Sequence, residues 1–307
     1  MRNFIKESIL FQSTAFFDEM TLVFDELKEL KENDILDSEQ IHRLSKIIKN
    51  KTNLNIVIDV TPGMGPAITI PQIDRNNPLI NNVNRSFLSS TDGLDMINKA
   101  GGVIQGTVNI KQARVTGVFA EIKATLYLGV ELIRGNQFTS SELAAMVFHE
   151  IGHLFTYFEF FSRTVVTNQI LAGLSKVTDG VENQDRREIA LVSAKQALRL
   201  DKFDISQLKG VDAKTIEIVF VDAVVTQTRS ELGYNLYAES SWEYLSDQFA
   251  ARHGAGADLA RALEKIYRKS GNIAFRSLGM YFLVEAIKIV LIYSSAGIGL
   301  AVILMLM

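Results

Sequence analysis

The sequence feature that most constrains the fold is a change of hydrophobic period at Gly135 and Asn136. In residues 124–132 apolar and other side chains alternate, which is typical of a strand with one buried face. After the break, apolar residues recur at spacings of three and four, which is typical of helices. The change predicts an α+β fold, with a small, mostly antiparallel sheet in the N-terminal half and a predominantly α-helical C-terminal half.

The remaining elements follow from weaker signals. Further strands are expected at 54–60, 103–110 and 115–120. Two helices precede the sheet, at 4–31 and 38–50, and Ser38 is expected to cap the second. Thr139 and Glu142 have the spacing of a capping box at the start of the helical half. From that point helices are expected at about 140–160, 162–176, 182–200, 213–230, 236–253, 256–270 and 274–306.

The composition excludes several kinds of site and partner. The 307-residue chain has no cysteine, which rules out disulfides, thiolate zinc sites and iron–sulfur clusters. A metal site must therefore use carboxylates and the four histidines, which are His42, His149, His153 and His253. The 32 basic and 35 acidic residues give a net charge of −3, and this near-balance argues against nucleic acid as a partner.

The first helix of the helical half contains the sequence His149-Glu150-Ile151-Gly152-His153. Positions i and i+4 of a helix differ by about 40° and lie one turn apart, so both imidazoles can hold one Zn²⁺. Glu150 follows His149 directly in the chain, and from there it can reach a zinc-bound water and act as a general base. Burying these polar side chains in an otherwise apolar helix is costly without a metal, so the pattern favours a functional site.

A catalytic zinc site needs a third protein ligand and one open position. Glu243 and Asp247 share one face of a later helix, where Glu243 can bind the metal. Asp247 can then accept the free N–H of a ligating histidine. Glu239 lies one turn before Glu243 and competes with it, and His253 would complete a three-histidine site. Glu159 is excluded as the third ligand, because six residues after His153 it faces another side of the same helix.

Two stretches of the chain resemble the gluzincin zinc metallopeptidases of the CAAX prenyl protease and HtpX type. The first runs from Leu126 to Leu154 and joins a strand, a turn and the H-E-x-x-H helix. The second contains an E-x-x-x-D helix, a short glycine-containing turn and a following helix. Its matching positions are Glu243, Asp247, Phe249, Ala250, Ala251, Ala260, Leu263 and Lys265. The two stretches cover about 30 and about 25 residues, and their order and spacing make the resemblance specific.

The resemblance implies a zincin-like domain over 53–288 that follows an N-terminal helical region at 1–52. It implies one zinc ion per chain, with His149, His153 and Glu243 as ligands and Glu150 as the catalytic base. Asp247 would be the residue that orients a ligand. The strand ending at Ile133 would be the sheet edge that binds the backbone of a peptide or protein substrate by β-augmentation.

The chain also departs from that family. The spacing from His153 to Glu243 leaves room for a helical insertion at about 162–230, and the family's membrane helices before the motif are missing. No proline follows Pro78, so the family's later His-Pro motif is absent, and with it the usual transition-state stabiliser. His253 is the candidate substitute for that role, but ten residues past Glu243 it is turned about 80° from that ligand, which favours a core or surface histidine.

The C-terminal segment 289–307 carries no charge and is near the minimum length that spans a bilayer. It is interpreted either as a membrane helix or as a buried core helix. Basic residues upstream of it predict that a membrane-anchored chain would keep its catalytic domain in the cytoplasm.

Two functions compete at the level of sequence, beside a third and weaker one, a tail-anchored interaction protein without a metal. The first is a zinc-dependent endopeptidase in which Glu150 activates a zinc-bound water for attack on the peptide bond. The second is a non-enzymatic, zinc-stabilised structural or assembly component, of a membrane or virion complex, that retains the metallopeptidase fold.

Overall fold

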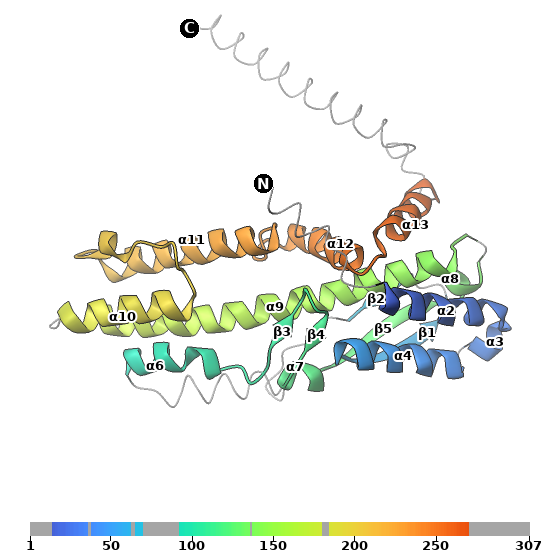
Figure 1. Ribbon diagram of the computed structural model, residues 1–307, viewed down its shortest axis with the longest axis horizontal. Coiled ribbons are helices and arrows are strands. Elements are labelled where there is room, and N and C mark those ends of the chain that lie inside the picture. The colour runs from blue at the N-terminus through green and yellow to red at the C-terminus, as the bar shows by residue number, and fades with distance from the viewer. Residues whose placement is uncertain are drawn as a thin grey trace, which may run out of the picture.

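The computed structural model describes residues 14–35, 38–62, 65–69, 92–135, 137–179 and 184–269. One helix, α9 (Ser140–Asp179), runs along most of the molecule (Figure 1). The sheet and the N-terminal helices lie at its first half, and a group of further helices packs along its second half (Figure 1). The chain is therefore mixed, with a small sheet and a large majority of helix, as the sequence predicts.

The N-terminal region forms three helices, α2 (Ala15–Glu29), α3 (Glu32–Ile35) and α4 (Glu39–Thr52). The predicted cap is confirmed, because the Ile41 N–H donates to Ser38 Oγ at 3.4 Å. At the other end of α4, Asn53 takes the left-handed conformation with φ 65°, and its N–H bonds to the carbonyl of Lys49. This closes the helix and turns the chain into the first strand.

The main sheet has the order β1-β5-β2. Strand β1 (Asn55–Thr61) pairs in parallel with β5 (Lys123–Gly129) along its whole length, and β2 (Ala67–Ile68) pairs antiparallel with the opposite edge of β5. The prediction of a mostly antiparallel sheet is thus wrong for its principal pair. Alternation of apolar residues reveals the buried face of a strand but not the direction of its neighbour, and the long connection between β1 and β5 permits a parallel crossover.

The connection between β2 and β5 holds short elements. They are α6 (Gly93–Lys99), the 3₁₀ turn η1 (Ala100–Gly102), β3 (Val108–Asn109), β4 (Arg114–Val115) and α7 (Val118–Glu121). The strands expected at 103–110 and 115–120 are therefore reduced to a hairpin of two strands with two residues each, and half of the second segment is helical. Val118 and Phe119 are buried within that helical turn.

The strand before the break ends earlier than its alternation predicts. β5 stops at Gly129, and Val130–Arg134 form the short helix α8. A helical turn buries Val130 and Ile133, which are three residues apart, and leaves Glu131 in the first turn and Arg134 in the last. These charges complement the helix dipole, which favours the turn over a continued strand.

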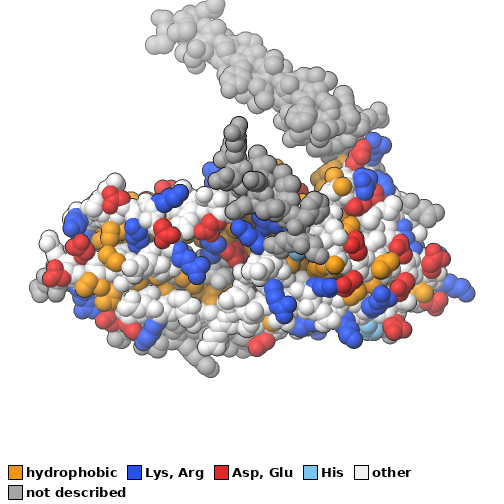
Figure 2. Space-filling model, viewed as in Figure 1, with side chains coloured by type: hydrophobic (Ala, Val, Ile, Leu, Met, Phe, Trp, Pro, Cys, Tyr) orange, Lys and Arg blue, Asp and Glu red, His pale blue; other side chains and the backbone are white. Residues whose placement is uncertain are grey.

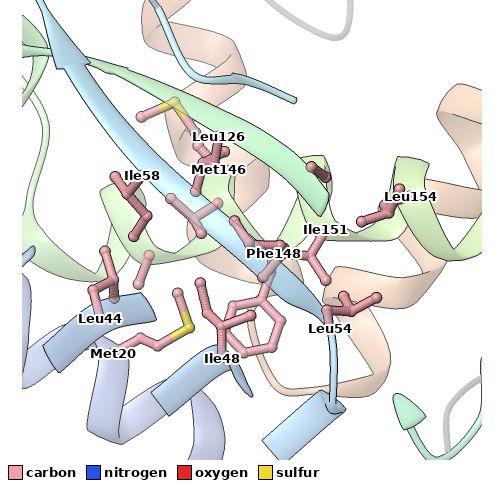
Figure 3. Packing of buried hydrophobic residues seen from close by; sticks show 14 of the residues in the cluster. Met20, Leu44, Ile48, Leu54, Ile58, Leu126, Met146, Phe148, Ile151 and Leu154 are labelled. Carbon is pink, nitrogen blue, oxygen red and sulfur yellow. The ribbon is translucent and has the colours of Figure 1, made fainter. Parts of the chain in front are cut away.

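The larger core lies between the sheet and the first half of α9. The inward residues of β1 and β5 meet Met146 and Ile151 of α9, and α2 and α4 close the same cluster. Figure 3 shows Met20 of α2 and Ile48 of α4 pointing toward Phe148 of α9. The N-terminal helices and the sheet thus share one hydrophobic core.

A second core surrounds the far half of α9. Its elements are α6, α10 (Gln184–Ala197), the 3₁₀ turn η2 (Ile205–Leu208) and α11 (Ala213–Leu232). The expected break near residue 161 does not occur, because neither Gly nor Pro interrupts the pattern there and α9 continues. The chain then returns through η3 (Glu239–Ser241), α12 (Trp242–Arg252) and α13 (Gly256–Lys269) to the first half of α9.

Among the described ranges, no helix has the length and apolar character that a membrane span requires. The expected helix at 274–306 and its apolar segment 289–307 lie outside the described residues.

Candidate metal centre

The start of α9 is fixed by the predicted capping box. The Glu142 N–H donates to Thr139 Oγ1 at 3.2 Å, and the Thr139 N–H donates to Glu142 Oε2 at 2.7 Å. Lys265 of α13 reaches the same carboxylate at 2.6 Å, and burial of Glu142 is nearly complete. Burial alone would raise the pKa of Glu142, but Lys265 and the Thr139 bond hold it below its ordinary value. These contacts set the rotation of α9 and hence the direction of its two histidines.

The two motif histidines converge on one point. His149 and His153 lie one turn apart on α9, and their Nε2 atoms are 3.0 Å from each other. Their ring centroids are 4.7 Å apart and the rings stand nearly perpendicular. Both side chains are mostly shielded, with exposed fractions of 13% and 17%. Two imidazole nitrogens at this separation can share one cation.

Helix α12 approaches α9 most closely at Gly152, inside the motif. A Cβ at this position would lie 2.8 Å from the Ser246 Cα and 3.0 Å from the Ser246 carbonyl oxygen. Only glycine lets the backbone of α12 come this near. The close crossing brings the face of α12 that carries Glu243 and Asp247 against the two histidines.

Aromatic contacts hold the start of α12 in place. The Trp242 ring lies 5.4 Å from Phe160 and 6.4 Å from Tyr157, both on α9. Its indole N–H donates to the Leu236 carbonyl at 3.0 Å. Trp242 is therefore a packing residue that positions the neighbouring Glu243.

Glu243 completes a group of three metal-binding side chains. Its Oε2 is 3.3 Å from His149 Nε2, and its Oε1 is 3.6 Å from His153 Nε2. The three ligand atoms of this group lie within 4.8 Å of one another. Ligands held about 2.0–2.1 Å from a tetrahedral zinc stand roughly 3.3 Å apart, so these separations suit that ion. The Glu243 side chain is 68% exposed, which leaves the group open on one side.

Asp247 orients the first histidine. Its Oδ1 lies 2.8 Å from His149 Nδ1, and in the tautomer with the proton on Nδ1 this nitrogen donates to the carboxylate and leaves Nε2 free on the side of Glu243. Burial lowers the pKa of His149, but Asp247, with smaller contributions from Glu150 and Glu243, raises it above the ordinary value overall. Burial and the neighbouring His149 lower the pKa of His153. Glu243 and Asp247 favour positive charge at both rings, which suits a cation, although burial outweighs them at His153.

Glu150 points to the sheet instead of the cluster. Its Oε2 accepts the Ile68 N–H of β2 at 3.1 Å. Burial raises the pKa of Glu150 to about 7, although the His149 charge and the Ile68 bond oppose the shift. A carboxylate with a pKa near neutrality is suited to accepting and returning a proton.

The structure separates the other predicted ligands from this group. Glu159 bonds to Arg163 at 2.6 Å on the next turn of α9. The side chain of Glu239 lies outside what the structure describes. His253 is only 5% exposed, and its ring lies among Phe16, Phe148 and Phe249 at 4.8–6.2 Å between centroids. His253 is therefore a core residue and not a partner of the metal-binding group, which corrects its expected role as transition-state stabiliser.

Two features of the site cannot be recognised from the sequence. Ile68 supplies a backbone donor to Glu150 from 82 positions away, and Gly152 sets the helix crossing. Neither has a side-chain signature, since one acts through its N–H and the other through the absence of a Cβ.

No protein-family model, curated protein or solved structure matches the chain. The chemistry of the donor set is therefore the basis for considering which metal the group could hold. Two imidazoles and a carboxylate, with a second carboxylate on the rear nitrogen of one imidazole, fit zinc.

Proposed function

We propose that this chain is a zinc-dependent endopeptidase in which His149, His153 and Glu243 hold the metal. The observation that carries the proposal is the convergence of these side chains from α9 and α12 at zinc-like separations. Glu150 lies next to the first ligand in the chain, and Asp247 fixes the tautomer of that ligand. These are the groups that metal-assisted hydrolysis of a peptide bond requires.

The roles of the side chains follow from their positions. Zinc bound there would polarise the scissile carbonyl and lower the pKa of a coordinated water to about 7. Glu150 would receive a proton on its carboxylate and pass it to the leaving amine. Asp247 would keep His149 in the tautomer that presents Nε2 to the metal. The exposed side of Glu243 leaves room for the substrate.

The proposed peptide-binding edge is that of β2 and not that of the strand before α9. β5 is flanked by β1 on one side and by β2 on the other, so it cannot be the edge expected from the sequence. Among the described residues, no strand pairs with the outer side of β2. That side lies next to Glu150, so an extended peptide added to β2 would run beside the metal-binding group.

The test compares the full chain with Glu150→Gln after both are loaded with zinc. We expect the wild type to cleave unfolded casein or a broad peptide library, and the variant to lose at least 100-fold in rate while retaining its zinc. If both proteins bind zinc and neither cleaves any peptide, the endopeptidase proposal fails. The zinc-stabilised structural or assembly component then becomes the better description.

A further inference from the structure

The hydrogen bonds of β2 define which of its backbone groups face outward. The Thr69 N–H donates to the Thr125 carbonyl at 2.8 Å, and the Thr125 N–H donates to Thr69 Oγ1 at 2.8 Å. Ile68 is the next residue of β2 and stands opposite Leu126 of β5. Bonded and non-bonded pairs alternate along an antiparallel ladder, so the Ile68 N–H points away from β5.

Glu150 occupies that outward donor. Its Oε2 accepts the Ile68 N–H at 3.1 Å, so the carboxylate sits on the very edge at which a further strand would pair. A backbone N–H is a single donor, and a strand added to β2 requires it for its own carbonyl. A docked strand and the Glu150 carboxylate therefore compete for one proton donor.

We propose that the Ile68 N–H holds Glu150 on the edge of β2 in the free protein, and that an extended substrate strand releases it by taking that donor. The inference rests on the proposed function, in which Glu150 is the base and the β2 edge receives the substrate. It makes Ile68 a positioning residue that acts through its backbone.

The competition also defines the substrate class. Only a segment that can lie extended, with a free carbonyl facing Ile68, can displace the carboxylate. Unfolded or unstructured peptide segments meet that condition. Helical segments do not, because their carbonyls are already bonded, and small esters lack a strand to pair.

Amide hydrogen exchange of the full chain tests the resting contact without requiring activity. The Ile68 amide should be protected in the wild type and should exchange at least about tenfold faster in Glu150→Ala, because a bond to a carboxylate is lost. The Thr69 amide, which bonds to Thr125 within the sheet, is the internal control and should keep its protection. Equal exchange at Ile68 in the two proteins, with Thr69 still protected, would overturn the proposal.

A matched pair of variants then tests the release step. Ile68→Pro removes the N–H, which is not part of the pairing with β5, whereas Ile68→Ala shortens the side chain and keeps the donor. In the Glu150→Ala background, where no carboxylate competes for the donor, we expect Ile68→Pro to bind an unfolded peptide about tenfold more weakly than Ile68→Ala. With Glu150 present the difference should shrink to about twofold, because the peptide then only exchanges one bond for another. Zinc content and Thr69 protection check that both variants are folded.

The two proposals fail in different ways. Cleavage by the wild type together with equal peptide affinity of Ile68→Pro and Ile68→Ala in the Glu150→Ala background would refute the role of Ile68 and leave the endopeptidase intact. If the exchange of the Ile68 amide depends on Glu150 but the wild type cleaves no peptide, the endopeptidase proposal is refuted. The proposed release of Glu150 as a catalytic base then fails with it.

Discussion

The two halves of α9 face different kinds of partner. Residues 140–161 pack against the sheet, α2, α12 and α13 in a large core that includes buried Phe148, Phe155 and Phe158. Residues 162–179 pack against α6, α10 and α11 in a smaller core. The two histidines of the metal-binding group lie on the first half, and Glu243 comes from α12, which packs against it. One helix therefore supports both regions, but only its first half contributes side chains to the site.

The far half exposes aliphatic side chains on two of its helices. Ile189 of α10 and Ile218 of α11 are 52% and 60% exposed. Figure 2 shows hydrophobic side chains among charged ones over the end of the molecule where α10 and α11 lie. A groove of about 480 Å³ runs between α11 and the turn at Arg199 to Phe203. The comparison teaches that the side chains brought together at a helix contact, and not burial as such, distinguish the region of the site.

Each half has one glycine at a close helix contact, which allows the comparison to be tested directly. Gly152 faces Ser246 of α12, whereas a Cβ at Gly173 would lie 2.5 Å from the Gly93 carbonyl of α6. We expect Gly152→Ala to cost about 2–3 kcal/mol of unfolding free energy, because overpacking exceeds the roughly 1 kcal/mol gain in helix propensity. Urea unfolding of the zinc-free proteins measures this.

The two glycine variants should differ in zinc binding. Gly152→Ala pushes Glu243 and Asp247 away from the histidines, so zinc affinity should fall at least tenfold. Gly173→Ala should lose comparable stability but bind zinc within about twofold of the wild type. Equal effects of the two variants on zinc affinity would show that the crossing at Gly152 does not position the site.

The next largest effect on zinc affinity is expected for a substitution of Asp247. Asp247→Asn retains the size of the side chain but weakens the acceptor for His149 Nδ1–H, so we expect zinc affinity to fall ten- to hundredfold. The unfolding free energy of the metal-free protein should change by less than about 1 kcal/mol, since the side chain is 43% exposed. Competition with a zinc chelator measures the affinity. A variant that binds zinc as the wild type does would remove Asp247 from the site.

The local parts of this arrangement were predictable. The H-E-x-x-H spacing, the capping box of Thr139 and Glu142, and the shared face of Glu243 and Asp247 each depend on residues within four positions, where helix geometry decides the outcome. The structure brings these groups together as that geometry suggests.

The non-local parts were not predictable, for physical reasons. The parallel pairing of β1 with β5 and the bond from Ile68 to Glu150 join segments far apart in sequence, and backbone groups are the same in every residue. His253 had two interpretations that only the fold separates. Its angle from Glu243 favoured a core or surface histidine over a transition-state stabiliser, and the structure places its ring among aromatic side chains.

His253 makes the larger core sensitive to acid. Burial, with a contribution from Arg252, lowers the pKa of His253 to about 4. The unfolded state binds a proton near pH 6.5 and the folded state does not, so stability is intact above that pH and falls between about pH 6.5 and 4. We expect His253 to remove about 2 kcal/mol of unfolding free energy between pH 7 and 5.

The matched variant for this prediction is His253→Leu, which lacks the titrating group. Urea unfolding of the zinc-free proteins at pH 7 and pH 5 should show a smaller loss in the variant than in the wild type. If both lose the same stability, the acid sensitivity arises from other groups.

Ser246 should give the smallest effect, although it lies at the same crossing as Gly152. It is fully buried, and its hydroxyl has no hydrogen-bond partner among the described residues. Ser246→Ala removes an unsatisfied polar group without adding volume, so stability should rise by up to about 1 kcal/mol. Zinc affinity should stay within twofold. A loss of stability above 1 kcal/mol would mean that the hydroxyl has a partner.

The zinc content of the purified chain tests the central claim most directly, because the claim joins ligands from two helices in one site. Mass spectrometry under native conditions should find one zinc per wild-type chain. In Glu243→Ala the zinc should be lost at micromolar free metal, while His253→Leu retains it. One zinc per chain in Glu243→Ala, held as tightly as in the wild type, would contradict the account.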